Sequence, residues 1–139
     1  RVALADVVSL SPLRLAAEDE ALIVDADAGN AEAECDLGLL LLTQDRAPEA
    51  VRWLARAADR LYPEAMHQLG RCYLVGRGVA ADRDAGMSWI GRAAARGHVT
   101  ADAVAAYLKD NTPPPALLDA ALDAIEQRVI LGALDEGLR

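Results

Sequence analysis

The 139-residue sequence contains no phenylalanine, two cysteines and a single lysine. Its hydrophobic content of 53% rests largely on alanine, so the chain lacks the bulky side chains that fill a sheet sandwich. It also lacks any run near the roughly 18 uninterrupted apolar residues that indicate a membrane span, and we therefore predict no membrane insertion. These absences favour a single all-α domain whose helices pack at close range.

The two cysteines and the first residue are the features of the sequence that relate to the cellular compartment of the protein. The sequence begins at Arg1 without methionine, so we expect a processed or partial chain, and bacterial cytoplasm and periplasm both stay open. Cys35 and Cys72 fall on predicted helices that should lie roughly 8–10 Å apart. A disulfide needs Cα atoms within about 7 Å. We therefore expect two free, buried thiols, which neither require nor exclude an oxidising compartment.

The net charge of −8 argues against nucleic-acid binding, which needs clustered lysine and arginine. The charge is unevenly spread, however. Residues 15–45 carry nine acidic side chains and no basic one, whereas residues 46–96 carry nine arginines against five acids, a net of 9 − 5 = +4. Two interpretations stay open: an ordinary solvated surface, or a surface complementary to a charged partner.

The most informative stretch is residues 65–101, which has the pattern of two helices joined by a loop. Ala65, Leu69 and Tyr73 recur every four residues and therefore share one face of a first helix. Gly70 lies inside that helix, where glycine costs about 1 kcal/mol relative to alanine. A helix that carries this cost usually has a packing reason for it, and we expect close approach of the second helix.

Turn and cap residues mark the ends of both helices in this stretch. Gly76 and Gly78 tolerate left-handed backbone and should end the first helix. Asp82 is a favourable N-cap for the second helix, which Gly97 should end. Two short helices that fold back on each other leave one hydrophobic face uncovered, so the unit needs a neighbour.

The order of these residues resembles the Sel1-like repeat (SLR), a branch of the tetratricopeptide (TPR-like) superfamily. Ala85, Gly86 and Ile90 depart from the repeat pattern, and Gly86 should weaken the second helix. The resemblance implies an α/α solenoid, a right-handed superhelix of antiparallel helix pairs whose concave side is lined by the first helix of each pair. The matching residues are Ala65, Leu69, Gly70, Tyr73, Gly76, Gly78, Val79, Asp82, Trp89, Arg92, Ala93, Ala94, Gly97 and Ala101.

A second, less regular copy of the pattern precedes this one. Its first half is offset by 32 residues, from Gly38 to Gly70, and its second half by 36, from Trp53 to Trp89. Periods in the thirties with helix–turn–helix content predict a helical-repeat array. We therefore predict one domain over residues 1–139, with an eroded half repeat at 12–30, repeats at 31–64 and 65–100, and capping helices at 101–139.

The last predicted helix, roughly residues 116–136, is amphipathic and long enough to cap the array. We expect it to cover the exposed face of the second repeat and of the short helix at 98–110. Its predicted polar side carries Asp119, Asp123, Glu126 and Arg128. Its predicted apolar stripe is Leu118, Leu122, Ile125, Val129 and Leu134.

No group of residues has the spacing of a catalytic or metal site. His67 and His98 lack a second ligand at a metal-binding spacing, and His98 matches the usual turn of the repeat. The Gly76–Gly78 loop follows a helix and lacks the lysine of a phosphate loop. Trp53 and Trp89 are expected in the core. We predict no cofactor, no metal and no enzymatic activity; a deep pocket that joins His67 to a carboxylate would contradict this.

The resemblance places a protein or peptide partner on the concave side. Counting back from each Leu-Gly pair gives the side chains expected there, and an apolar patch beside Arg71 and Tyr107 has the composition of an interaction surface. Alternatively, the terminal helices fill this groove, and both arrangements stay open. The predicted partner-binding residues are Glu32, Leu39, Leu42, Glu64, His67, Arg71, Leu74 and Tyr107.

Two functional hypotheses follow. The first is a non-catalytic protein-interaction module, a scaffold or adaptor of a bacterial SLR protein. The second is a specific inhibitor, of the immunity-protein type, whose acidic residues 15–45 occlude a basic effector. Binding that weakens steeply with salt would favour the second hypothesis.

Overall fold

The computed structural model describes the backbone of residues 17–137 and the side chains of residues 21–137; the predicted helix start at residues 11–12 lies outside this range. Within it the chain forms seven helices and no strand. The helices are α2 (Ala17–Asp27), α3 (Ala31–Thr43), α4 (Ala47–Asp59), α5 (Pro63–Val75), α6 (Arg83–Ala95), α7 (Val99–Asp110) and α8 (Pro115–Gly137).

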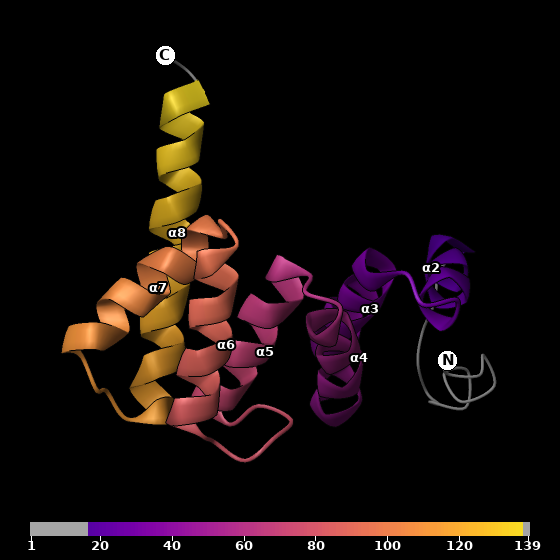
Figure 1. Ribbon diagram of the computed structural model, residues 1–139, viewed down its shortest axis with the longest axis horizontal. Coiled ribbons are helices and arrows are strands. Elements are labelled where there is room, and N and C mark those ends of the chain that lie inside the picture. The colour runs from indigo at the N-terminus through magenta and orange to yellow at the C-terminus, as the bar shows by residue number, and fades with distance from the viewer. Residues whose placement is uncertain (1–16, 138–139) are drawn as a thin grey trace.

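Each helix from α2 to α7 packs against the next one in sequence, so the chain is a helical-repeat solenoid (Figure 1). The hairpins α3–α4 and α5–α6 are the two repeats, and α7 follows as a further first helix. The last helix, α8, departs from this order because it contacts both α7 and α5. It therefore lies across the first helices of two successive units.

The helix ends are fixed by local side chains, as the sequence predicts. The Asp82 carboxylate accepts a hydrogen bond from the N–H of Ala85 (3.0 Å), and Asn30 caps α3 in the same way. Gly76 ends α5 with a left-handed φ of 74°. These three caps set one end each of α3, α5 and α6 through local contacts.

Close packing within each repeat depends on a glycine in its first helix. A Cβ atom added to Gly38 would lie 2.8 Å from Leu54 Cγ, and one added to Gly70 would lie 2.9 Å from Ile90 Cγ1. Both distances are shorter than a Cβ contact allows, so α3–α4 and α5–α6 approach more closely than alanine would permit. The expected packing reason for Gly70 is confirmed.

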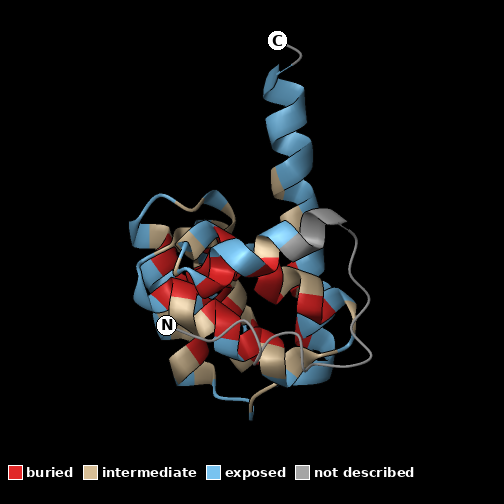
Figure 2. Cartoon of the chain, turned by 90° about the vertical axis from the view of Figure 1, so that its right-hand side faces the viewer, coloured by how far each residue is buried: buried red, intermediate tan, exposed pale blue. Residues whose placement is uncertain are grey.

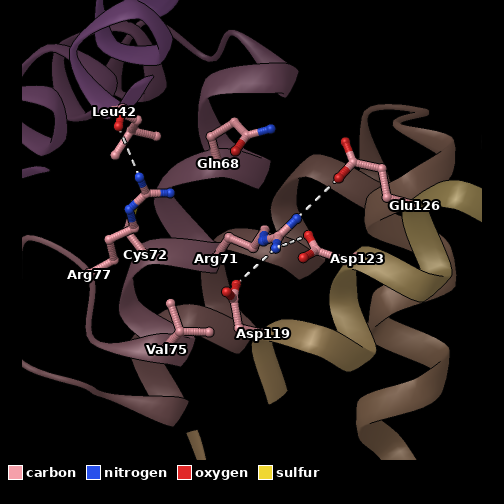
Figure 3. Close-up of a pocket in the computed structure, with 9 residues that line it drawn as sticks. All are labelled: Leu42, Gln68, Arg71, Cys72, Val75, Arg77, Asp119, Asp123 and Glu126. Carbon is pink, nitrogen blue, oxygen red and sulfur yellow. Dashed lines mark hydrogen bonds and ion pairs between the residues drawn. The ribbon is translucent and has the colours of Figure 1, made fainter. Parts of the chain in front are cut away.

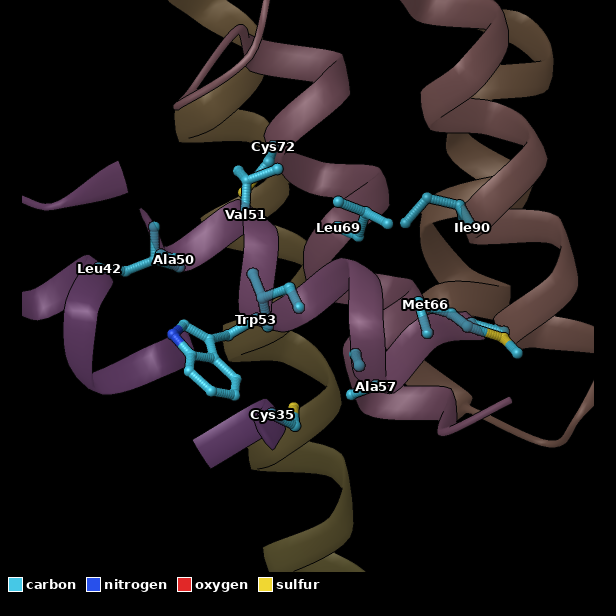
Figure 4. Close-up of a cluster of buried hydrophobic side chains, with 14 of the residues drawn as sticks. Cys35, Leu42, Ala50, Val51, Trp53, Ala57, Met66, Leu69, Cys72 and Ile90 are labelled. Carbon is cyan, nitrogen blue, oxygen red and sulfur yellow. The ribbon is translucent and has the colours of Figure 1, made fainter. Parts of the chain in front are cut away.

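The core runs through the two repeats and is built mainly from small and aliphatic side chains (Figure 4). Trp53 is buried, with 5% of its surface exposed, as expected for a core residue. Trp89, its counterpart, is only half-buried and carries the Arg92 guanidinium 4.4 Å above its ring. The expectation of two equivalent core tryptophans is therefore right for Trp53 and too strong for Trp89.

One charged group is fully buried between the helices of the first repeat. Glu34 on α3 has no exposed side-chain surface and bonds to Arg56 (2.8 Å) and Arg60 (2.9 Å) of α4. Buried carboxylates need such partners because desolvation is costly. Part of the acidic charge of residues 15–45 is thus neutralised inside the fold.

The long helix α8 divides into a packed half and a projecting half (Figure 2). Leu118, Leu122 and Ile125 are buried, whereas Val129 is half-buried and Leu134 is 60% exposed. The predicted apolar stripe is therefore correct over its first three members and wrong at Leu134, because α8 continues past the end of α7 and α5.

Candidate functional site

An ion-pair cluster joins α5 of the second repeat to α8 (Figure 3). Arg71 of α5 donates hydrogen bonds to Asp119 (2.9 Å), Asp123 (2.6 Å) and Glu126 (3.1 Å). The three carboxylates recur at spacings of four and three, so one side of α8 presents all of them to Arg71. Only 15% of the Arg71 side chain is exposed.

This cluster lines a small cavity between α3, α5 and α8. Its volume is about 180 Å³, and Leu42, Gln68 and Cys72 also line it. Burial raises the pKa of the Cys72 thiol, although the nearby arginines Arg77 and Arg71 oppose the shift. A thiol held protonated in this way is a poor nucleophile.

A second polar cluster joins α5 to the start of α7. The His98 Nδ1 accepts the N–H of Ala101 (3.0 Å), which leaves the proton on Nε2 to donate to the Glu64 carboxylate. The His67 ring stacks on His98, with 4.6 Å between centroids. Sequence reasoning found the structural role of His98 but not its bond to Glu64, which lies 34 residues away.

Burial shapes the pKa values of this cluster. Desolvation, aided by the neighbouring His98 and Arg71 and opposed by Glu64, lowers the pKa of His67 to about 4. Desolvation would raise the pKa of Glu64, but hydrogen bonds from His98 and Gln68 outweigh it and lower the pKa. His67 is only 2% exposed, so it is not presented to a substrate.

A third feature is an acidic surface on α2 and α3, at the other end of the array. Asp25, Glu32 and Asp36 line a cleft between these helices together with Leu22, Asn30 and Ala33, and the described part of the lining contains no basic residue. Burial and the repulsion of Glu32 and Glu64 raise the pKa of Asp36. The sequence analysis missed Asp36, although it lies one turn from Glu32.

Cys35 lies beneath this acidic surface. Its thiol is buried, and desolvation together with Glu64, Asp36 and Glu32 raises its pKa to about 12. Cys35 and Cys72 are both free and buried, as expected. Across the part of the chain that the structure describes, no group of three or more histidine, cysteine or acidic residues is arranged to hold a metal ion.

The structure separates the eight residues predicted to bind a partner into three groups. Leu42 of α3 and His67 and Leu74 of α5 are buried within the chain. Glu64 and Arg71 are bonded to His98 and to α8, respectively. Glu32 is exposed, while Leu39 and Tyr107 are half-buried. Of the two alternatives for the groove, α8 packs against α5 at the second repeat, and among the described helices it makes no comparable contact with α3.

Comparison with known families finds one repeat model that matches both helical hairpins. A family model described as Sel1 repeat matches residues 31–60 and 63–98, which contain α3–α4 and α5–α6. No curated protein matches the chain. Among the described residues, none of the helices is both long and apolar enough to cross a membrane.

Proposed function

Because this chain is a Sel1-like repeat protein, and Sel1 repeats are generally protein–protein interaction modules, we propose that it is a non-catalytic scaffold or adaptor. Its partner binds the side of the first repeat formed by α3, together with α2 beside it. The corresponding side of the second repeat is taken by the chain's own α8 through Arg71.

The observation that carries this proposal is the unneutralised acidic cleft. Asp25, Glu32 and Asp36 lie together with no basic partner among the described residues of the cleft lining, and the pKa of Asp36 is raised first by burial and then by the repulsion of Glu32 and Glu64. A cationic side chain inserted among them would relieve that repulsion and gain charge-assisted hydrogen bonds. We therefore propose a partner segment rich in arginine or lysine.

The test is a screen of the immobilised chain against an array of basic and acidic helical peptides. We expect basic peptides to bind, with affinity that falls as salt increases. The variant Glu32→Gln/Asp36→Asn should lose this binding, while the matched variant Asp59→Asn/Asp110→Asn removes the same charge from exposed sites elsewhere and should retain it. Equal binding by both variants would refute the assignment of the partner surface.

The second candidate function is the specific inhibitor. The same acidic surface supports it, since a basic effector could be occluded there. The two functions differ in consequence: an inhibitor abolishes the activity of the protein it captures, whereas an adaptor leaves that activity intact.

A further inference from the structure

The side of α8 that faces away from the solenoid carries a regular spacing of nonpolar and uncharged residues, although these residues do not pack against α5 or α7. Beginning at Leu117, nonpolar or uncharged side chains recur at alternating spacings of three and four, the a and d positions of a coiled coil. At 100° per residue this seam lies on the opposite side of α8 from Leu118, Leu122 and Ile125, which face α5 and α7. The seam consists of Leu117, Ala120, Ala124, Gln127, Leu131 and Leu134.

Every member of the seam is exposed (Figure 2). Leu117, Leu131 and Leu134 have 64%, 61% and 60% of their surface accessible. Single exposed leucines are ordinary, but a periodic row of them along one helix indicates an interaction surface. The row extends over the projecting half of α8 shown in Figure 1.

The projecting half also needs a neighbour on energetic grounds. The helix continues from Glu126 to Gly137 past its last buried residue, Ile125. Isolated helical segments shorter than about 12–15 residues are marginal in water. Gly132 lies within this half, has nothing within 4 Å of an added Cβ, and weakens it further. An unsupported helix of this kind gains most of its stability from a partner helix.

We propose that the α8 seam pairs with the α8 seam of a second copy of this chain, as a parallel, in-register coiled coil. In that arrangement Gln127 faces Gln127 of the second copy, and an amide can both donate to and accept from its twin. Asp123 bonds to Arg71 through Oδ1 within its own chain, and its side chain is still 62% exposed. At a g position it lies beside Arg128 at the following e position of the second copy, an attractive pair formed twice by symmetry. Both pairings are self-complementary, which favours a second copy over an unrelated helix.

An antiparallel pair fits less well. In the register that places Gln127 opposite Leu131, it brings e positions opposite each other, so that Arg128 faces Arg128 of the second copy and repels it. The parallel pair also keeps the two solenoids apart, because each packs on the side of α8 that faces away from the seam. Alanine and glutamine layers bury little area, so the dimer is weak and concentration-dependent.

The first test is sedimentation equilibrium of the full chain from about 5 to about 500 µM, a range suited to a small, transient interface. We expect the mass to rise from that of a monomer towards twice that value. The variant Leu131→Asp/Leu134→Asp should remain monomeric with an unchanged melting temperature of the solenoid. The control Val24→Asp, which alters a 55% exposed residue on α2, should dimerise like the parent. A monomer throughout, or a dimer in the seam variant, overturns the proposal.

The second test distinguishes the register by oxidative cross-linking. Gln127→Cys should form a disulfide dimer, since equivalent d positions of a parallel pair bring Cα atoms to about 6 Å. Glu136→Cys, on the far side of the helix, should not, and the natural Cys35 and Cys72 are buried. Cross-linking that requires a mixture of Gln127→Cys and Leu131→Cys chains would refute the parallel register and assign the antiparallel one.

Discussion

Gly86 of α6 lies directly against Gly70 of α5. A Cβ atom added to Gly86 would lie 2.9 Å from the carbonyl oxygen of Gly70, and one added to Gly70 would lie 3.0 Å from that of Gly86. The two backbones therefore touch. The predicted weakening of α6 by Gly86 is offset by this close approach, which no larger residue allows.

The first prediction concerns this contact. Gly70→Ala should lower the free energy of unfolding by about 1–2 kcal/mol, because its methyl group overlaps Ile90 and forces the helices apart. Gly91→Ala is the matched control: the residue is exposed on α6 and an added Cβ meets nothing within 4 Å. That variant should gain about 0.5–1 kcal/mol from better helix propensity. Urea denaturation measures both, and changes of equal sign would contradict the contact.

The fold was predictable because the signals for a helical hairpin are local. Asp82 and Gly76 specify a helix start and a helix end from their own chemistry, whatever surrounds them. Gly70 inside a helix indicates that another helix packs closely against it, and the helix–loop–helix pattern of the repeat identifies that helix as the next one in sequence. Each of these inferences spans at most one hairpin.

The candidate site was only partly predictable because it depends on how distant segments meet. Arg71 and Asp119 are 48 residues apart in the sequence. Neither the spacing of the residues in α8 nor their charge predicts which groove of the solenoid α8 occupies. Similarly, counting from the Leu-Gly pair places Leu74 on the correct helix but does not predict that it is buried. Leu74 packs closely against α6, since a Cβ on Gly86 would lie 2.7 Å from Leu74 Cγ. A change at Leu74 therefore tests folding, not binding.

The second prediction concerns the attachment of α8. Arg71→Met keeps the aliphatic stem but leaves Asp119, Asp123 and Glu126 without their common cation, so their repulsion should loosen the helix. Hydrogen–deuterium exchange of the amides of residues 115–126 should accelerate at least several-fold, while α3 and α4 stay protected. Arg52→Met, an exposed change on α4, is the control and should leave exchange unaltered. Unchanged protection of α8 in both variants would show that its apolar contacts alone hold it.

The third prediction uses two equivalent helix ends. Leu61 follows the C-cap of α4 with a left-handed φ of 67°, and Gly97 follows that of α6 with a φ of 87°. Left-handed backbone costs a non-glycine residue about 1 kcal/mol. Leu61→Gly should therefore raise the free energy of unfolding by about 0.5–1 kcal/mol, and Gly97→Leu should lower it by about 1 kcal/mol. Thermal melts of the two variants should move in opposite directions; a loss in both would mean that packing of Leu61 outweighs its strain.

The fourth prediction concerns pH. Burial, aided by His98 and Arg71, lowers the pKa of His67 from its ordinary 6.5 to about 4 in the folded chain. Between these values the unfolded chain binds a proton that the folded chain does not, so stability is complete above pH 6.5 and falls as pH drops towards 4.

From pH 7.5 to 5 this loss should amount to about 2 kcal/mol, at about 1.4 kcal/mol per pH unit below 6.5. His67→Gln cannot titrate, so its free energy of unfolding should stay nearly flat over that range. Below pH 4.5 both proteins should lose stability because the Glu64 carboxylate becomes protonated. Burial would raise the pKa of Glu64, but the hydrogen bonds from His98 and Gln68 outweigh it and lower the pKa, so protonation is less favourable in the folded chain than in the unfolded chain. Denaturation curves at several pH values measure these slopes. A parent chain as insensitive as His67→Gln between pH 7.5 and 5 would show that His67 takes up a proton as readily when folded as when unfolded.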